Sequence, residues 1–305
     1  MKKLNITVFI IVLLSNLLSA KGPGTTVANF LKIGVGARPV GLGESFTAVA
    51  DDVSTIFWNP AGLATIKEQE IVFAYNKWFE DIYQGFVGYS KPLEGIGTFG
   101  LGIIYLSMKD IPGYDEWDYK IDPVKSNDMA FAVSYSRTIT EDSLSDASIQ
   151  TGANVKYIRQ QLADETGAAV AMDAGILCKL SAVSFGASVQ NFGTKMKFNE
   201  KEEPLPLSIK FGNAVKLLNN NLVIALDVNF PADNKTYFSV GAEYWLLNIL
   251  VLRVGYRGKV DLGNGVTLGT GFRIKSVQVD YAFVNYDELK YTHRISVIYK
   301  FGESQ

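Results

Sequence analysis

Residues 33–63 read IGVGARPVGLGESFTAVADDVSTIFWNPAGL, a stretch without sustained alternation of apolar and polar residues. Beyond Glu70 the chain alternates with a period of two almost to its end, which indicates one short β-strand after another. The stretch is rich in glycine and directly precedes the first of these strands. We therefore interpret residues 21–66 as a folded segment around which residues 67–305 are arranged.

The end of this stretch, Trp58-Asn59-Pro60-Ala61-Gly62-Leu63, predicts a rigid turn beside an aromatic side chain. Pro60 restricts Asn59 to extended backbone, because the proline ring collides with a helical conformation of the residue before it. Gly62 permits a positive φ, since it has no Cβ.

Two runs upstream of the turn, FLKIG and ESFTAVADD, have residue types that suit short helices. Asp51, Asp52 and Ser54 could cap a helix that follows, because their side-chain oxygens accept hydrogen bonds from its first free N–H groups. The pair Asp51-Asp52 could alternatively bind a metal ion. A cap or a solvated turn is the commoner use of such a pair, so we expect no metal and no cofactor.

The composition excludes several classes of protein. Of the 305 residues, 48% are hydrophobic and 20% are charged, which excludes a mainly disordered chain. The 15 Tyr, 18 Phe and 28 Gly suit a β architecture with tight turns and close strand contacts. The formal net charge of −2 provides no basic surface for nucleic acid. Cys178 is the only cysteine, which excludes a disulfide framework within the chain.

The N-terminus, MKKLNITVFIIVLLSNLLSA, has the layout of a secretory signal peptide. Lys2 and Lys3 form a positive start, residues 6–18 form an apolar run, and Ser19 and Ala20 are small residues suited to cleavage. A membrane-spanning helix is disfavoured because the apolar run is too short. We therefore expect residues 1–20 to be removed on export.

Segments with period-two alternation follow, separated by turn signals rich in Pro, Gly and Asn. Most have the length with which a tilted strand crosses a bilayer, about 9–11 residues. We predict about fourteen strands, at 70–78, 83–91, 97–107, 127–138, 148–159, 168–179, 182–191, 206–215, 221–230, 236–246, 249–258, 265–274, 276–284 and 293–301.

The two faces of these segments differ consistently. In the last one, Ile295, Val297 and Tyr299 alternate with Arg294 and Ser296. A soluble sandwich or barrel would bury the apolar face, whereas a membrane barrel turns that face to lipid and the polar face to its lumen. The export signal, the strand length and the aromatic residues at strand ends favour an all-β fold, a transmembrane antiparallel β-barrel in the outer membrane of a diderm (Gram-negative-type) bacterium.

A barrel of about 14 strands is too wide for its own side chains to fill, so residues 21–66 are predicted to plug it as a hatch. Charged side chains in the lumen should form compensating pairs, because an unpaired buried charge is costly. The hairpin at Leu247-Asn248 predicts one pair, between Glu243 and Arg253. These charges could serve only the lumen, or they could contact a transported molecule. The inward-facing candidates are Lys156, Asp173, Asp227, Glu243, Arg253, Arg257, Asp280 and Arg294.

No catalytic signature is recognisable in the chain. His293 is the only histidine and stands at the start of the last predicted strand, which disfavours a zinc site or a Ser–His–Asp triad. A phosphate-binding G-x-x-x-x-G-K-[ST] loop is also missing from the sequence. We therefore expect a protein that is not an enzyme.

Residues 36–64, GARPVGLGESFTAVADDVSTIFWNPAGLA, resemble the N-terminal signature of the PorV/PorQ family of outer-membrane proteins. That family is related to the FadL-type fatty-acid transporters and to similar uncharacterised barrels of spirochaetes. The combination of Ala-Asp-Asp with Asn-Pro-Ala-Gly-Leu carries the resemblance. It implies a fourteen-stranded barrel with an N-terminal hatch, and the corresponding hatch residues here are Ala50, Asp51, Asp52, Trp58, Asn59, Pro60, Ala61 and Gly62.

The resemblance implies two possible functions. FadL-type members bind hydrophobic small molecules in the barrel and pass them across the outer membrane when the hatch rearranges. PorV-type members serve the type IX secretion system by shuttling exported proteins to their surface attachment. Our leading hypothesis is passive, hatch-gated movement of a fatty-acid-like molecule. The alternative is a shuttle or scaffold for secreted proteins, with residues 108–127 as its docking surface.

Overall fold

The structure is a computed structural model, and it describes residues 22, 24–142, 146–198, 201–258 and 263–302. The predicted signal peptide, residues 1–20, lies outside the described residues.

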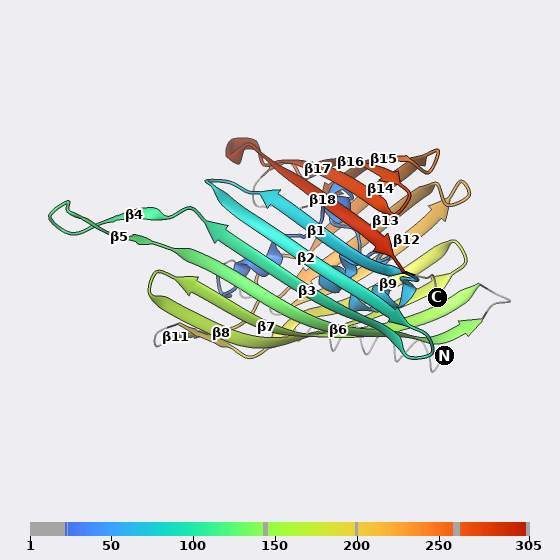
Figure 1. The fold of residues 1–305 in the computed structure, drawn as a ribbon, viewed down its shortest axis with the longest axis horizontal. Helices are drawn as coiled ribbons and strands as arrows, with labels where there is room; N and C mark the ends of the chain where they lie inside the picture. Colours follow the sequence, from blue (N-terminus) through green and yellow to red (C-terminus); the bar gives the residue numbers. More distant parts are fainter. Residues whose placement is uncertain (1–21, 23, 143–145, 199–200, 259–262, 303–305) are drawn as a thin grey trace.

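Within the described residues, fourteen antiparallel strands close into one barrel (Figure 1). Each strand pairs with the barrel strands before and after it in the chain, and β1 pairs with β18 to close the sheet. The predicted architecture is thus confirmed, and every predicted strand overlaps an observed one. The barrel strands are β1 (Gln69–Lys77), β2 (Ile82–Leu93), β3 (Gly97–Met108), β6 (Ser126–Asp142), β7 (Ala147–Leu162), β8 (Glu165–Leu180), β9 (Val183–Gly193), β12 (Ser208–Leu217), β13 (Leu222–Pro231), β14 (Tyr237–Leu246), β15 (Leu250–Arg257), β16 (Val266–Ile274), β17 (Val277–Asn285) and β18 (Tyr291–Phe301).

Two hairpins lie outside the barrel sheet in the described part of the chain: β4 (Ile111–Tyr114) with β5 (Lys120–Val124), and β10 (Met196–Phe198) with β11 (Lys201–Glu203). The first hairpin, which lies within residues 108–127, was not among the predicted strands. Its turn is fixed by Asp115, whose Oδ1 accepts hydrogen bonds from the N–H groups of Trp117 and Tyr119 at 2.9 and 2.8 Å. Such a local side-chain turn leaves no period-two signal.

The apolar face of the barrel points outward and the polar face points inward. In β18 the side chain of Ile295 is 49% exposed, whereas Arg294 is 2% exposed. The same inversion holds for β13, where Leu226 is exposed and Asp227 is buried. A soluble protein rarely exposes so large an apolar surface, so the wall faces lipid and the soluble alternative is rejected.

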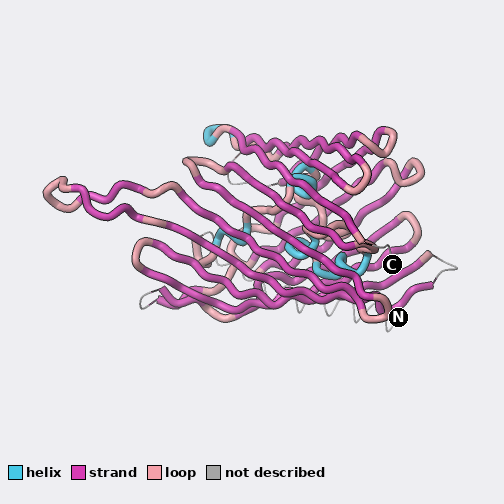
Figure 2. Tube along the Cα trace, in the orientation of Figure 1, coloured by secondary structure: helices cyan, strands magenta, loops and turns pink. Residues whose placement is uncertain are grey.

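The N-terminal segment lies inside the barrel, where Figure 2 shows its short helices in cyan. These helices are η1 (Asn29–Lys32), α2 (Ala37–Gly41), α3 (Thr55–Trp58) and η2 (Pro60–Thr65), and a further short helix, η3 (Asp287–Leu289), joins β17 to β18. Apolar side chains of the segment pack against the inner wall, as Ile56 does against Phe86 and Ile104. No helix in the described part of the chain has the length and apolar character needed to cross a membrane.

The run ESFTAVADD, residues 44–52, is not helical, so the helix prediction for it is wrong. Asp227 on β13 accepts hydrogen bonds from the backbone N–H groups of Phe46 and Thr47, at 3.1 and 3.0 Å. These contacts with the wall hold the run in a series of turns. Tertiary contacts therefore override local helix propensity here.

The two ends of the barrel differ in the length of their connections. Gln69 at the start of β1 lies opposite Phe301 at the end of β18, so both strands reach the same end. Turns at that end are short, as between β8 and β9 or between β16 and β17, whereas residues 109–125 and 194–207 connect strands at the other end. Outer-membrane barrels have short periplasmic turns and longer extracellular loops. The β4–β5 hairpin is therefore extracellular.

Candidate functional site

The contact between the N-terminal segment and the barrel wall contains many buried polar side chains, and the Asn59 turn is part of it. The Nδ2 group of Asn59 donates to the backbone oxygens of Thr47 and of Ile176 on β8, at 2.7 and 3.2 Å. Its Oδ1 accepts from the N–H of Ala61 at 3.2 Å and so caps η2, whose first residue is Pro60. One fully buried side chain thus joins two parts of the segment to the wall.

The wall is shaped to receive this turn. A Cβ on Gly175 of β8 would collide with Oδ1 of Asn59, so only glycine permits the approach. Asn59 itself is extended, with φ −156° and ψ 101°, which agrees with the restriction expected from Pro60. The turn and the wall are therefore complementary at the level of backbone atoms.

Gly62 serves a different purpose from the one we expected. Its φ is not among the positive values, so the predicted positive φ is wrong. A Cβ on Gly62 would instead collide with the carbonyl oxygen of Ala50 and the hydroxyl of Thr55. Ala50, at φ 29°, lies where the backbone reverses direction. Gly62 is required by close packing within the segment.

Arg38, at the second position of α2, organises the largest group of buried charges. Its guanidinium binds Glu243 on β14 with both Nε and Nη2 at 2.9 Å. Its Nη1 contacts Asp51 at 2.6 Å and Asp52 at 2.8 Å. Bidentate pairing of this kind is among the strongest polar contacts in proteins. Arg38 therefore connects the acidic pair of the segment to the barrel wall.

The network continues along the wall. Glu243 also binds Nε of Arg253 on β15 at 2.6 Å, and Nη1 of Arg253 binds Asp280 on β17 at 2.7 Å. Gln278 donates to the other oxygen of Asp280 at 2.8 Å. The structure thus brings Asp51, Asp52, Glu243, Arg253 and Asp280 into a single chain of charges.

Charge pairing shifts the pKa values of groups in the segment. Burial by itself raises the pKa of Asp51, but the adjacent Arg38 guanidinium, helped by Lys216, lowers that pKa well below its usual range. Burial lowers the pKa of Arg38, but Asp51, Glu243 and Asp52 raise it further above its usual value. Both groups are therefore held in their charged forms.

Asp52 takes part in a local turn as well. Its Oδ1 accepts from the N–H of Ser54 at 2.9 Å and from the Ser54 hydroxyl. Ser54 precedes α3 but makes no capping hydrogen bond with its own side chain. The acidic pair thus serves a turn and an ion-pair network. No cluster of potential metal ligands occurs among the described residues.

A second pair anchors the segment near α3. Nζ of Lys156 on β7 lies 2.7 Å from Asp173 on β8. The other oxygen of Asp173 accepts from Asn154 at 2.9 Å, and the same amide of Asn154 donates to the backbone oxygen of Ile56 at 2.6 Å. This pair reaches the segment only through a neutral amide, unlike the Arg38 network.

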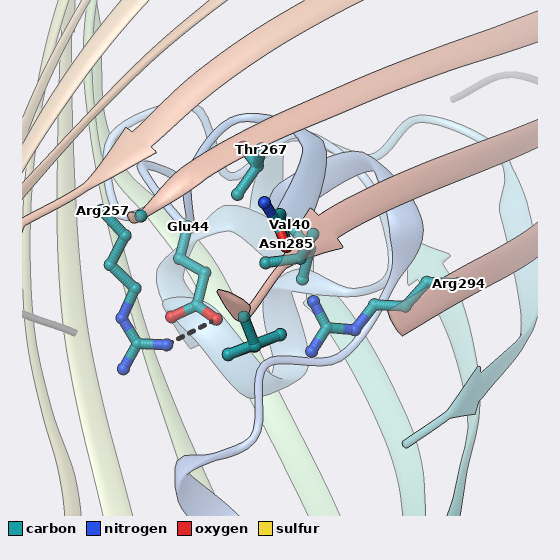
Figure 3. Close-up of a pocket in the computed structure, with 9 residues that line it drawn as sticks. Val40, Glu44, Arg257, Thr267, Asn285 and Arg294 are labelled. Carbon is teal, nitrogen blue, oxygen red and sulfur yellow. Dashed lines mark hydrogen bonds and ion pairs between the residues drawn. The ribbon is translucent and has the colours of Figure 1, made fainter. Parts of the chain in front are cut away.

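Two further lumen arginines differ in their partners. Arg257 on β15 binds Glu44 at 3.1 Å (Figure 3). Its guanidinium also lies over the ring of Tyr237, 5.0 Å from the ring centre. Arg294 on β18 is buried, and none of its three guanidinium nitrogens has a hydrogen-bond partner among the described residues. Its guanidinium lies 5.3 Å from the Trp78 ring.

Trp58 closes one side of a small internal cavity. Its Nε1 donates to the backbone oxygen of Val35 at 3.1 Å, and Nζ of Lys210 on β12 lies 4.7 Å above its ring. The cavity has a volume of about 80 Å³. Its lining combines aromatic side chains with three basic and two acidic ones: Phe57, Trp58, Tyr237, Lys32, Lys210, Arg257, Glu44 and Asp233.

The predicted candidates did not include three charged residues of this site: Arg38, Glu44 and Lys210. A signal for the first two was present, because they are the only charged residues between Ile33 and Ala50. A charge in an otherwise apolar, glycine-rich run inside a barrel requires a partner. Lys210 could have been assigned from its position on the inward face of β12.

A family model described as the type IX secretion system protein PorV matches residues 20–233, well over half of the chain. The chain belongs to the PorV family. The PorV match includes the whole N-terminal segment and the strands through β13, so the resemblance identified in residues 36–64 is confirmed.

Solved structures similar to this PorV-family chain are FadL-like barrels. A Pseudomonas aeruginosa FadL homologue is 11% identical, with a TM-score of 0.59, covering 88% of this chain and 99% of its own. CymD, a monoaromatic hydrocarbon channel, is 12% identical, with a TM-score of 0.63 and coverages of 89% and 99%. The Pseudomonas putida toluene transporter TodX is 13% identical, with a TM-score of 0.55 and coverages of 85% and 96%. No curated protein matched the sequence.

At such low identities these similarities establish the fold. Family and fold together identify the protein as a FadL-like outer-membrane β-barrel. The matching family and the similar structures are secretion proteins, channels and transporters rather than enzymes.

Proposed function

We propose that the protein is a component of a type IX-like secretion system, in which a plugged outer-membrane barrel presents an extracellular hairpin to secreted proteins. The observation that carries this proposal is the β4–β5 hairpin, which extends beyond the rim of the barrel (Figure 1, left). The family description, type IX secretion system protein PorV, supports the same role.

The hairpin has the chemistry of a protein-binding surface. Trp117 and Tyr119 at its tip are 69% and 70% exposed, and Tyr114, Ile111 and Ile121 are exposed along its strands. Large aromatic side chains are the residues that most often dominate binding at protein interfaces. Because Asp115 fixes the turn, these side chains are presented on an ordered backbone, which lowers the entropic cost of binding.

The N-terminal segment fills the lumen in a way that supports a plugged barrel more than an open path for a small molecule. The N-terminal segment is joined to the wall by Arg38, Asn59 and Asp227, all of them buried. The cavity beside Trp58, at about 80 Å³, is far smaller than the 300–1,000 Å³ typical of ligand pockets.

The test compares two extracellular variants in cells that lack the native protein. Trp117→Ala with Tyr119→Ala should reduce the surface display of secreted proteins at least tenfold, measured by quantitative proteomics of the cell surface and the medium. Leu162→Ala, another exposed apolar residue at the same end of the barrel, is the matched control and should leave display unchanged. Normal display by the hairpin variant would reject the proposal, provided that both variants reach the outer membrane equally.

A second candidate function is the binding or passive passage of a hydrophobic small molecule. It is favoured by the fold shared with CymD and TodX and by the lining of the cavity beside Trp58. This lining is aromatic and has three basic residues against two acidic ones, which suits an apolar molecule with an acidic group. Mass spectrometry of the native protein, extracted from outer membranes in mild detergent, distinguishes the two. A stoichiometric hydrophobic compound would favour passage, whereas a stoichiometric secreted protein without such a compound would favour the secretion role.

A further inference from the structure

The side chain of Arg294 differs from those of the buried arginines Arg38 and Arg253, which form ion pairs, because no ion pair of Arg294 occurs among the described residues. It is 2% exposed, and Nε, Nη1 and Nη2 are all without a hydrogen-bond partner among the described residues. The facing residues in the sheet, Asn76 on β1 and Ala282 on β17, provide no negative charge. The guanidinium of an arginine is a permanent positive charge in proteins.

Arg294 borders a small cavity between the N-terminal segment and the wall. Figure 3 shows its guanidinium on one side of this space, with Arg257 and Glu44 on the other. The neutral residues Val40, Thr267, Val284, Asn285 and Tyr286 complete the lining. The cavity measures about 10 Å³, which is room for one species the size of a water molecule.

The charges around this cavity do not cancel. Glu44 forms an ion pair with Arg257 at 3.1 Å, so the pair is neutral as a whole. The charge of Arg294 is left over, and the ring of Trp78, 5.3 Å away, offsets it only in part. A buried charge without a counter-charge is strongly destabilising. A water molecule could accept hydrogen bonds from the guanidinium but would leave its charge uncompensated.

We propose that this cavity binds a single monatomic anion of halide size, held by the guanidinium of Arg294. An anion would accept hydrogen bonds from nitrogens that otherwise have none, and it would restore neutrality in the cavity. Larger anions such as phosphate or the carboxylate of a fatty acid exceed the available volume. The bound anion would lie between β18 and the N-terminal segment, whose Val40 and Glu44 also line the cavity. This inference is independent of whether the barrel serves protein secretion or small molecules.

The direct test is a crystal structure of the full-length native protein, purified without chloride and crystallised in sodium bromide. Diffraction data collected at the bromine absorption edge should show an anomalous peak within hydrogen-bonding distance of the Arg294 guanidinium. A cavity that is empty, or that holds density without an anomalous signal, would overturn the proposal.

A solution measurement provides an independent readout. The thermal midpoint of the native protein should rise by about 2–4 °C when sodium gluconate is replaced by sodium chloride at constant ionic strength, because a ligand that binds only the folded state stabilises it. The variant Arg294→Met removes the charge while keeping an unbranched side chain, and its midpoint should not respond. Arg273→Met, which removes another lumen-side arginine that already bonds Gln278, should keep the full response. A native midpoint indifferent to chloride, or a response that survives in Arg294→Met, would contradict anion binding at this site.

Discussion

Arg38 is the residue on which the buried charges of the lumen converge. It alone joins Asp51 and Asp52 of the N-terminal segment to Glu243 of the wall. Removing one partner of a buried ion pair leaves the other charge uncompensated, at a cost of about 3–5 kcal/mol. We therefore expect Arg38→Met to lower the free energy of unfolding by about that amount, measured by urea denaturation in lipid vesicles with tryptophan fluorescence.

The matched control for Arg38 is an ion pair in solvent. Lys109 and Asp81 lie 3.9 Å apart and are both exposed, and such pairs contribute at most about 1 kcal/mol. Lys109→Met should therefore be nearly neutral. Equal effects of the two substitutions would show that the lumen network does not stabilise the fold. Arg38→Met combined with Glu243→Gln should be less destabilised than the sum of the two single variants, because the two side chains interact directly.

Asp51 gives a prediction about pH. Its pKa in the folded protein is lower than the ordinary value of about 3.9, so folding favours the ionised form. The resulting stabilisation is fully present above the pKa of the unfolded chain and is lost as the pH falls through the folded pKa. The native protein should thus exceed Asp51→Asn in unfolding free energy at pH 7, and the difference should shrink from about pH 4 downward. A difference that stays constant between pH 7 and pH 3 would contradict the assignment.

At the level of single residues, the sequence predicted which side chains face the lumen better than it predicted which side chains pair with one another. The inward position of Glu243, Arg253 and Asp280 followed from alternation, and the Glu243–Arg253 pair followed from a tight turn. The partnership of Arg38 with Glu243 joins residues about two hundred positions apart, and no local pattern encodes it. The lack of a partner for Arg294 could not be predicted from the sequence either. It depends on the residues that face Arg294 on the neighbouring strands, Asn76 and Ala282, neither of which is acidic.

At the scale of elements, the Asn59 turn is the part of the N-terminal segment that most constrains its position. Asn59→Ala with Pro60→Ala removes three hydrogen bonds and the proline restriction, while Gly175 leaves a gap behind. We expect a loss of about 2–4 kcal/mol in stability and a measurable increase in conductance of the protein in planar bilayers, because a loosened plug admits ions.

The control for this turn is an asparagine with the same local chemistry outside the lumen. Asn264 is exposed, and its Oδ1 accepts from the N–H of Val266 at 3.0 Å. Asn264→Ala should change neither stability nor conductance appreciably. If the turn variant conducts no more than this control, the segment does not act as a movable hatch around Asn59.

The wrong secondary-structure predictions concern segments whose conformation depends on contacts with distant parts of the chain. Period-two alternation located all fourteen barrel strands, because each strand has one face in lipid and the other in the lumen. The run ESFTAVADD was expected to be helical, but Asp227 binds its backbone from across the lumen. The predicted ranges of β6, β7 and β8 were too short: the ends of β6 and β7 were placed too early and the start of β8 too late. These strands continue past the bilayer, where one face no longer has to be apolar and the alternation is lost.

At the scale of the whole molecule, the outward apolar face of the barrel should tolerate a charged residue poorly if it contacts lipid, and well if it contacts water. Val254, in the middle of β15, is 51% exposed on this face. An arginine on the lipid face near the bilayer midplane costs about 2–4 kcal/mol, whereas an exposed surface substitution in water changes stability by only about 0.5 kcal/mol. Val254→Arg should therefore impair folding into vesicles and lower the unfolding free energy by about 2–4 kcal/mol.

Leu247 provides the matched position for this comparison. It is an apolar residue with 90% exposure, but it lies in the turn between β14 and β15, at the periplasmic end and outside the hydrocarbon core. Leu247→Arg should fold as the native protein does, because its charge remains in water. The comparison holds the introduced residue constant and changes only its depth, so the difference between the two variants measures the lipid environment. Equal behaviour of the two would mean that the middle of β15 is not in contact with lipid.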